Sequence, residues 1–133
     1  MKIYSLIATL IIFASFIMNG CSSKNSAATG YRQISAQEAM TIMEKERGYI
    51  ILDVRTKEEY DAGHIAGAVN VPLQSITDGK IAALADKNQL ILVYCRSGNR
   101  SKAASEKLAA NGYTNIVEFG GINQWSGKIE KIV

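Results

Sequence analysis

Two short apolar runs rich in β-branched residues constrain the fold of this 133-residue chain most strongly. These are "YIILDV" at 49–54 and "QLILVYC" at 89–95, and such compact runs are typical of strands buried on both faces of a sheet. Segments with helical periodicity, including 35–46 and 99–113, alternate with the strand-like runs. Alternation of strands and helices favours right-handed βαβ units. The sequence therefore predicts an α/β fold built on a parallel sheet.

Polar residues mark where two of the helices begin. Ser35 is an expected N-cap, and Glu38 three residues later completes a capping-box pattern. Thr56 is an expected N-cap for a short helix that carries Glu58 and Glu59 in its first turn, where we expect both to be solvated.

The less regular segments give weaker expectations. A last strand is predicted at 115–120, and a terminal helix or turn at 121–133. The segment 73–86 has a break at Asp78-Gly79, with a helix expected after it. Gly120-Gly121 is expected to form a turn, and Trp125 to anchor the core or its rim.

The first twenty residues have the pattern of a signal peptide. Lys2 precedes an apolar run from Ile3 to Met18, which at 16 residues is shorter than the ~20 that a spanning helix needs. The Gly20-Cys21 step after it resembles the lipobox of bacterial lipoproteins, which implies lipidation of Cys21; ordinary cleavage or a retained anchor are the alternatives.

The expected domain organisation follows from that boundary. Residues 1–20 are the signal peptide, and the small polar residues at 21–30 form a flexible tether. Residues 31–133 form one globular domain, which we expect outside the cytoplasm and anchored to the membrane by lipid.

Charge and ligand counts exclude two function classes. The formal net charge is +3 with scattered Lys and Arg, so nucleic-acid binding is not expected. Cys21, His64 and Cys95 are too few for the four Cys/His ligands of a structural zinc site, so no metal is predicted.

The most informative motif follows the second strand-like run. Cys95 is succeeded by Arg96, Ser97, Gly98, Asn99 and Arg100. Ligands of open parallel sheets bind beyond the carboxyl ends of the strands, which is where Cys95 would lie. Nearby cations and a helix N-terminus favour the thiolate form of a cysteine. The glycine allows a tight loop with inward N–H groups, and the arginines suit an oxyanion. We therefore predict a nucleophilic sulfur within an anion-binding loop.

This loop resembles the active-site loop of the rhodanese sulfurtransferases. Four residues separate Cys95 from Arg100, whereas cysteine phosphatases have five. "ILDVRTKEEYDAGHIAGAVNVP" at 51–72 and "GGINQWSGKI" at 120–129 resemble two further signatures of that family. The three signatures together span about residues 31–130, and they imply a parallel sheet with helices on both faces.

The resemblance implies specific roles. Cys95 would accept sulfur from a small anionic donor such as thiosulfate and pass it to a thiol or cyanide, with no cofactor. Backbone N–H groups of Arg96, Ser97, Gly98, Asn99 and Arg100 would cradle the transferred sulfur, and the two arginines would hold the donor's oxygens. Asp53 and Arg55 match the family's Asp-x-Arg motif, which supports the architecture of the site.

Three alternatives remain at this level. A phosphatase or arsenate reductase could use a similar loop. A Cys95–His64 pair would indicate a thiol protease or acyltransferase, although we expect His64 to be structural. A non-catalytic sulfur carrier or binding module is the third.

Overall fold

The computed structural model describes residues 30–77 and 81–133. The predicted signal peptide, all but the last residue of the predicted tether, and the predicted break at Asp78-Gly79 lie outside the described residues. Within the described ranges, no helix is long and apolar enough to cross a membrane.

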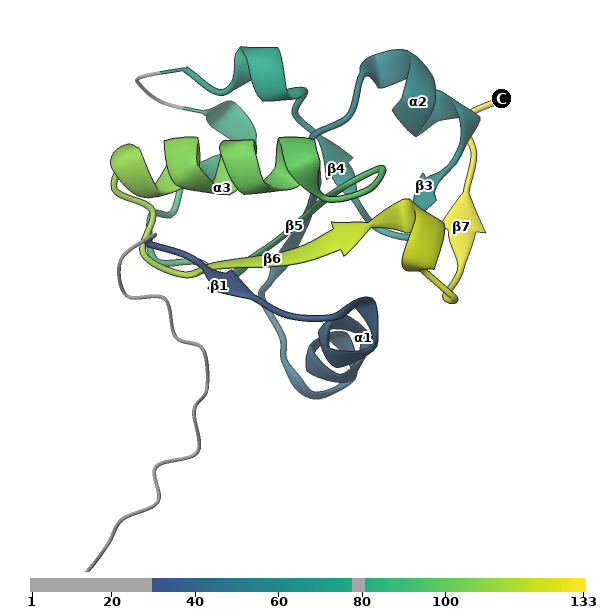
Figure 1. The fold of residues 1–133 in the computed structure, drawn as a ribbon, viewed down its shortest axis with the longest axis horizontal. Helices are drawn as coiled ribbons and strands as arrows, with labels where there is room; N and C mark the ends of the chain where they lie inside the picture. The colour runs from purple at the N-terminus through teal and green to yellow at the C-terminus, as the bar shows by residue number, and fades with distance from the viewer. Residues whose placement is uncertain (1–29, 78–80) are drawn as a thin grey trace, which may run out of the picture.

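A five-stranded sheet forms the centre of the domain, and all its neighbouring strands are parallel (Figure 1). In spatial order its strands are β1 (Arg32–Gln33), β6 (Ile116–Gly121), β5 (Ile91–Cys95), β2 (Ile50–Asp53) and β4 (Val69–Asn70). A separate antiparallel pair joins β3 (His64–Ile65) to β7 (Ile129–Glu130). The prediction of an α/β fold on a parallel sheet is confirmed.

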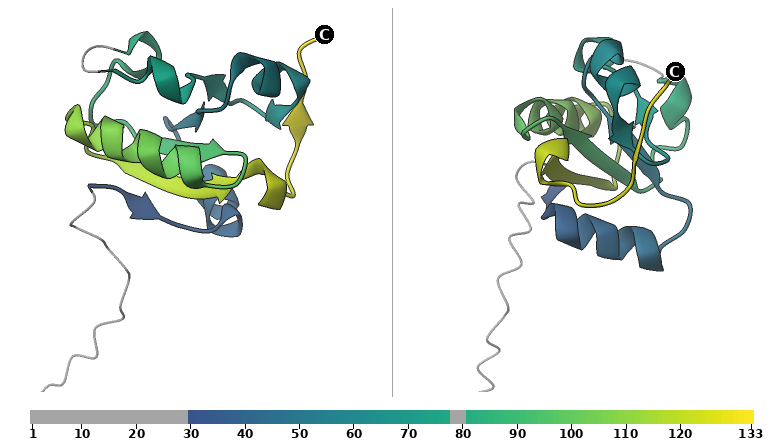
Figure 2. Two further views of the ribbon diagram at one scale, coloured as in Figure 1. Left: turned by 45° about the horizontal axis from the view of Figure 1, so that its top comes forward. Right: turned by 90° about the vertical axis from the view of Figure 1, so that its right-hand side faces the viewer.

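Helices cover both faces of this sheet. Helix α1 (Ala36–Lys45) lies on one face and α3 (Asn99–Ala110) on the other, as Figures 1 and 2 show. Alternate side chains of β5 supply the two cores: Val93 and Cys95 pack on the side of α3, and Leu92 and Tyr94 on the side of α1. Because both faces are covered, β5 is buried along its whole length, as its unbroken apolar sequence predicts.

The predicted capping box at Ser35 is present, and the predicted N-cap Thr56 also forms one. The Ser35 hydroxyl accepts from the Glu38 N–H at the start of α1. Thr56 and Glu59 form the equivalent pair at the start of α2 (Lys57–Ala62). Each cap satisfies helix N–H groups that have no partner within the helix.

Two segments differ from the sequence-based expectation. The segment after Pro72 forms single 3-10 turns, η1 (Leu73–Ser75) and η2 (Ala82–Leu84), instead of a longer helix. Ile81 and Leu84 are both buried, and their spacing of three suits a 3-10 turn. The C-terminal segment forms the 3-10 turn η3 (Ile122–Gln124) and then β7, a strand that depends on pairing with the distant β3.

Candidate active site

Cys95 is the last residue of β5, at the carboxyl edge of the sheet, and only 1% of its surface is exposed. Its neighbour on β6 is Gly121, and the register of the two strands shifts between Val93 and Cys95. Such an irregularity redirects the chain at the end of a strand. Here the chain leaves the sheet and enters the loop 96–98.

The loop bends around the Cys95 sulfur. Gly98 adopts a left-handed conformation with φ 110°, which a residue with a side chain rarely adopts. This conformation brings the Gly98 N–H to 3.0 Å from Sγ, as a donor. Helix α3 begins at Asn99, as predicted, so its N-terminus also faces the sulfur.

These contacts favour the thiolate form of Cys95. Burial raises the pKa of the thiol, but hydrogen bonds from the Ser101 hydroxyl and from the N–H groups of Ser101, Gly98 and Ser97 outweigh this effect. The resulting pKa of Cys95 lies below its usual value. A lower pKa makes more of the nucleophilic form available at neutral pH.

Ser101 and Glu118 belong to the site although the sequence analysis missed them. The Ser101 Oγ lies 3.5 Å from the Cys95 Sγ and 2.6 Å from Oε1 of Glu118. Glu118 is 3% exposed and also accepts a hydrogen bond from the Gly120 N–H. One signal was available: Glu118 interrupts the apolar strand sequence 115–120 at a position that the alternation assigns to the core.

The prediction of a turn at Gly120-Gly121 is wrong, because these residues complete β6. A Cβ at Gly121 would overlap the carbonyl group of Arg96 and the backbone N of Ser97. The Arg96 carbonyl also accepts from the Asn123 N–H at 3.3 Å. The glycine is therefore needed for close contact between the Cys95 loop and β6.

The polar residues of the loop differ in exposure. Arg96, Ser97 and Asn99 are exposed, whereas Arg100 is partly buried. Arg100 makes a bidentate ion pair with Glu59 of α2, at 2.7 and 2.9 Å. The expectation that Glu59 is merely solvated is therefore wrong. Arg100 uses two of its five N–H donors in this pair.

Asp53, the last residue of β2, and Arg55 form a buried ion pair, with Arg55 Nη2 2.7 Å from Asp53 Oδ2. The same carboxylate accepts from the Tyr94 hydroxyl at 2.6 Å, and Arg55 donates to the carbonyl of Gly63 at 2.6 Å. The pair therefore links the end of β2 to the residue before Cys95 and to the α2–β3 connection.

His64 lies on β3, between Gly63 and Ile65, whose backbones are bonded to Arg55 and Tyr94. Its ring is buried, stacks on Tyr60 with centroids 3.8 Å apart, and its Nδ1 lies 2.8 Å from the Tyr60 carbonyl oxygen. In the described part of the chain, no hydrogen bond joins His64 to Cys95. These contacts agree with a structural role. Trp125, as expected, packs at the rim of the core against Phe119.

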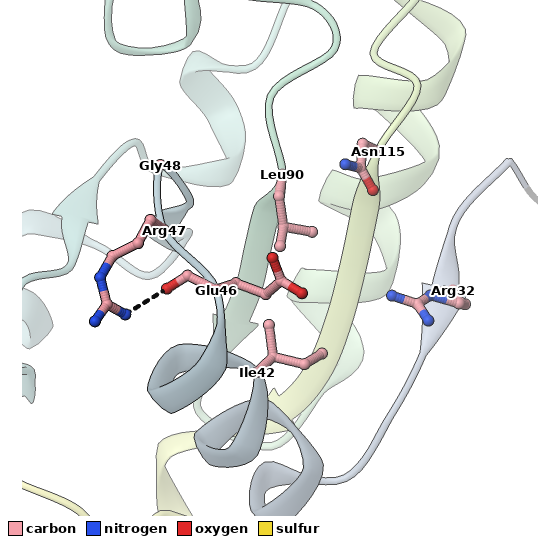
Figure 3. A pocket seen from close by; sticks show the side chains of 7 residues that line it. All are labelled: Arg32, Ile42, Glu46, Arg47, Gly48, Leu90 and Asn115. Atoms are coloured by element: carbon pink, nitrogen blue, oxygen red, sulfur yellow. Dashed lines mark hydrogen bonds between the residues drawn. The ribbon is translucent and has the colours of Figure 1, made fainter.

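A pocket of about 520 Å³ lies at the opposite edge of the sheet (Figure 3). Leu90 and Asn115, which line it, immediately precede β5 and β6, so the pocket lies at the amino ends of the strands. Cys95 is at the carboxyl end of β5. The pocket is therefore separate from the cysteine site. Among the described residues, no three His, Cys, Asp or Glu side chains group as metal ligands.

A parallel sheet with helices on both faces and a cysteine cradled at its carboxyl edge is the arrangement of an α/β domain that uses a cysteine nucleophile. Residues 35–128 match the family model of the rhodanese-like domain, and the chain belongs to this family of sulfurtransferases. The fold of the chain and the position of Cys95 agree with this family.

The chain is similar to several known proteins. It is 39% identical over 71 residues to the thiosulfate sulfurtransferase PspE of Escherichia coli strain K12. This match covers 53% of this chain and 68% of PspE. It is 35% identical over 125 residues to the uncharacterized protein YqhL of Bacillus subtilis strain 168, over 91% of this chain and 93% of YqhL. A solved structure described as a rhodanese with anions from E. coli matches with TM-score 0.58 and 35% identity, over 62% of this chain and 98% of that one.

The Glu59–Arg100 pair predicts acid-sensitive stability. The hydrogen bond from Arg100 lowers the pKa of Glu59 from 4.5 to about 2. A depressed carboxyl pKa adds stability above pH 4.5, and this contribution is lost as the pH falls toward 2. Glu59→Gln should therefore destabilise the protein at neutral pH, and the difference from wild type should shrink across this window. Urea unfolding at a series of pH values measures it.

The neighbouring exposed Glu58→Gln, on the same helix turn, is the matched control. Parallel stability curves for wild type and Glu59→Gln would contradict a stabilising role of the pair.

Proposed function

We propose that this protein is an exported sulfurtransferase that moves sulfane sulfur from thiosulfate, or a similar anionic donor, to a thiophilic acceptor through a Cys95 persulfide. The observation that carries the proposal is the Cys95 sulfur, which accepts a hydrogen bond from the Gly98 N–H within a basic loop. Its hydrogen bonds also lower the pKa of the thiol. The relative named thiosulfate sulfurtransferase supports thiosulfate as the donor.

The first half of the reaction needs only the thiolate and the loop. The Cys95 thiolate attacks the sulfane sulfur of thiosulfate and forms a new S–S bond. The donor's own S–S bond breaks, and sulfite leaves with the bonding electron pair. Backbone N–H groups of residues 96–100 stabilise the negative charge on the outer sulfur of the persulfide, as oriented donors do at other anionic centres.

The second half returns the enzyme to its starting state. The acceptor, cyanide or a thiolate, attacks the outer sulfur of the persulfide, and Cys95 leaves as a thiolate. A low pKa favours this step as well, because a stabilised thiolate is a better leaving group. No step requires a metal or an organic cofactor.

The two arginines have different places in this proposal. The exposed Arg96 attracts anionic donors to the loop. Arg100 is held by Glu59, which fixes the guanidinium beside the site. Three of its five N–H groups remain free to bind the oxygens of thiosulfate.

Incubation of the full chain with thiosulfate should add the mass of one sulfur atom. Cys95→Ser should abolish the addition because the attacking sulfur is gone, whereas Cys21→Ser should retain it. Mass spectrometry of the intact protein measures both. An unchanged mass of the wild-type protein would refute the persulfide.

Arg100→Ala should lower kcat/KM for thiosulfate roughly ten- to hundredfold, since a hydrogen bond to a charged group contributes about 1.5–3 kcal/mol. Lys102→Ala, an exposed cation two residues further along α3, is the charge-matched control. Steady-state thiosulfate:cyanide turnover measures the effect. Equal kcat/KM for Arg100→Ala and Lys102→Ala would remove Arg100 from donor binding.

Export and lipid anchoring rest on the sequence pattern of residues 1–21. Bacteria that express the full chain should incorporate labelled fatty acid into it, and the protein should sediment with membranes. Cys21→Ser should lose the label, because the acyl chains are attached to that residue. Equal labelling of the variant, or wild-type protein found unlabelled in the cytosol, would contradict this part of the proposal.

A further inference from the structure

Glu118 is a carboxylate on the core-facing side of a buried strand. Along β6, Val117 and Phe119 pack toward α1, whereas Ile116 and Glu118 face α3. In the described ranges, none of the ion pairs includes Glu118. Burial of a carboxylate is costly unless hydrogen bonds compensate for lost water. The partners of Glu118 therefore define what it can do.

Those partners lead directly to the active sulfur. Oε1 of Glu118 lies 2.6 Å from the Ser101 Oγ, which in turn lies 3.5 Å from the Cys95 Sγ. A serine hydroxyl carries a single proton. Besides Glu118 and the Cys95 thiolate, the carbonyl oxygens of Gly98 and Gly120 lie within its reach, at 2.9 and 3.3 Å. The Glu118 carboxylate is the nearest of these acceptors, and the hydroxyl cannot donate to Glu118 and to the thiolate at the same time. If both groups were ionised, one of them would lose the hydroxyl donor and keep only backbone N–H donors, such as Gly98 for the sulfur and Gly120 for Glu118.

We propose that Cys95 and Glu118 share one proton through Ser101, so that Glu118 accepts the proton released when Cys95 becomes a thiolate. This inference rests on the proposed role of Cys95 as the sulfur-accepting nucleophile. In one of the two arrangements of the shared proton, the Cys95 S–H donates to Ser101, and the Ser101 hydroxyl donates to the Glu118 carboxylate.

Activation moves two protons by one position each. The Cys95 S–H bond breaks, its electron pair stays on sulfur, and its proton passes to the Ser101 oxygen. The proton that Ser101 carried passes to Oε1 of Glu118. The net charge of the three groups is unchanged, and Ser101 now donates to the thiolate. Glu118 acts through Ser101 and is a positioning residue.

Other charged groups lie around the Cys95–Ser101–Glu118 series, but none of them stands between its members. Arg100, paired with Glu59 of α2, interacts electrostatically with Cys95 and with Asp53, whose own partner is Arg55.

Two arginines complete the surroundings. Arg96 is exposed in the loop, and Arg32 of β1 stands opposite Val117, one register position from Glu118. Helix α1 packs on the other face of β6. Ser101 is hydrogen-bonded to Glu118 and is also in contact with the Cys95 sulfur, so it links the two groups.

The test is a pH titration of the ultraviolet absorbance of the Cys95 thiolate. The signal is the difference between the full chain and its Cys95→Ser variant, which removes contributions from Cys21 and the tyrosines. Two groups that share a proton titrate in two macroscopic steps. Wild-type protein should show two steps, separated by at least about one pH unit, or tenfold in proton affinity.

Glu118→Gln should show a single step, because the amide keeps the shape of the side chain but does not accept the proton. Ser101→Ala should also show a single step, at higher pH, because the thiolate loses its hydroxyl donor. Glu106→Gln, an exposed glutamate on α3, should keep both steps.

A single step in wild type, with the same midpoint in Glu118→Gln, would overturn the proposal. Two steps that persist in Glu118→Gln would also overturn it, because the second group would then lie elsewhere. If Glu118→Gln does not fold, wild type and Ser101→Ala decide the question. The titration contains no sulfur donor, so its failure is distinct from a failure of thiosulfate to load Cys95.

Discussion

The site depends on direct backbone contact between the Cys95 loop and the end of β6. Gly121 has no side chain, and the Arg96–Ser97 backbone occupies the space that a Cβ would fill. This contact holds the loop down against the sheet, so that the Gly98 N–H meets the Cys95 sulfur. The anion cradle is therefore a consequence of close packing between two neighbouring parallel strands and the connection that follows one of them.

Separate elements converge on the sulfur from several sides. β5 delivers Cys95, α3 supplies Ser101 and Arg100, and β6 supplies Glu118. Helix α2 adds Glu59, which holds Arg100. The buried Asp53–Arg55 pair joins the end of β2 to Tyr94, the residue before the cysteine. Preorganisation of this kind lowers the cost of holding charge in the transition state.

Local patterns predicted much of this arrangement. The apolar run of β5, the N-caps Ser35 and Thr56, and the helix start at Asn99 all depend on short-range signals, and all are present. Features made by distant segments were missed, because no local pattern encodes them. The β3–β7 pair, the Glu59–Arg100 ion pair and the Ser101–Glu118 hydrogen bond each join residues far apart in the chain. The role of Gly121 was misread for the same reason, since the group that excludes its side chain lies on the Cys95 loop.

The most direct test of a Cys95 persulfide held by the loop is a crystal structure of the protein after treatment with thiosulfate. We predict one additional sulfur atom bonded to the Cys95 Sγ, within hydrogen-bonding distance of backbone N–H groups of residues 96–100. A Cys95 sulfur that remains unmodified, or an outer sulfur that points away from these N–H groups, would contradict it.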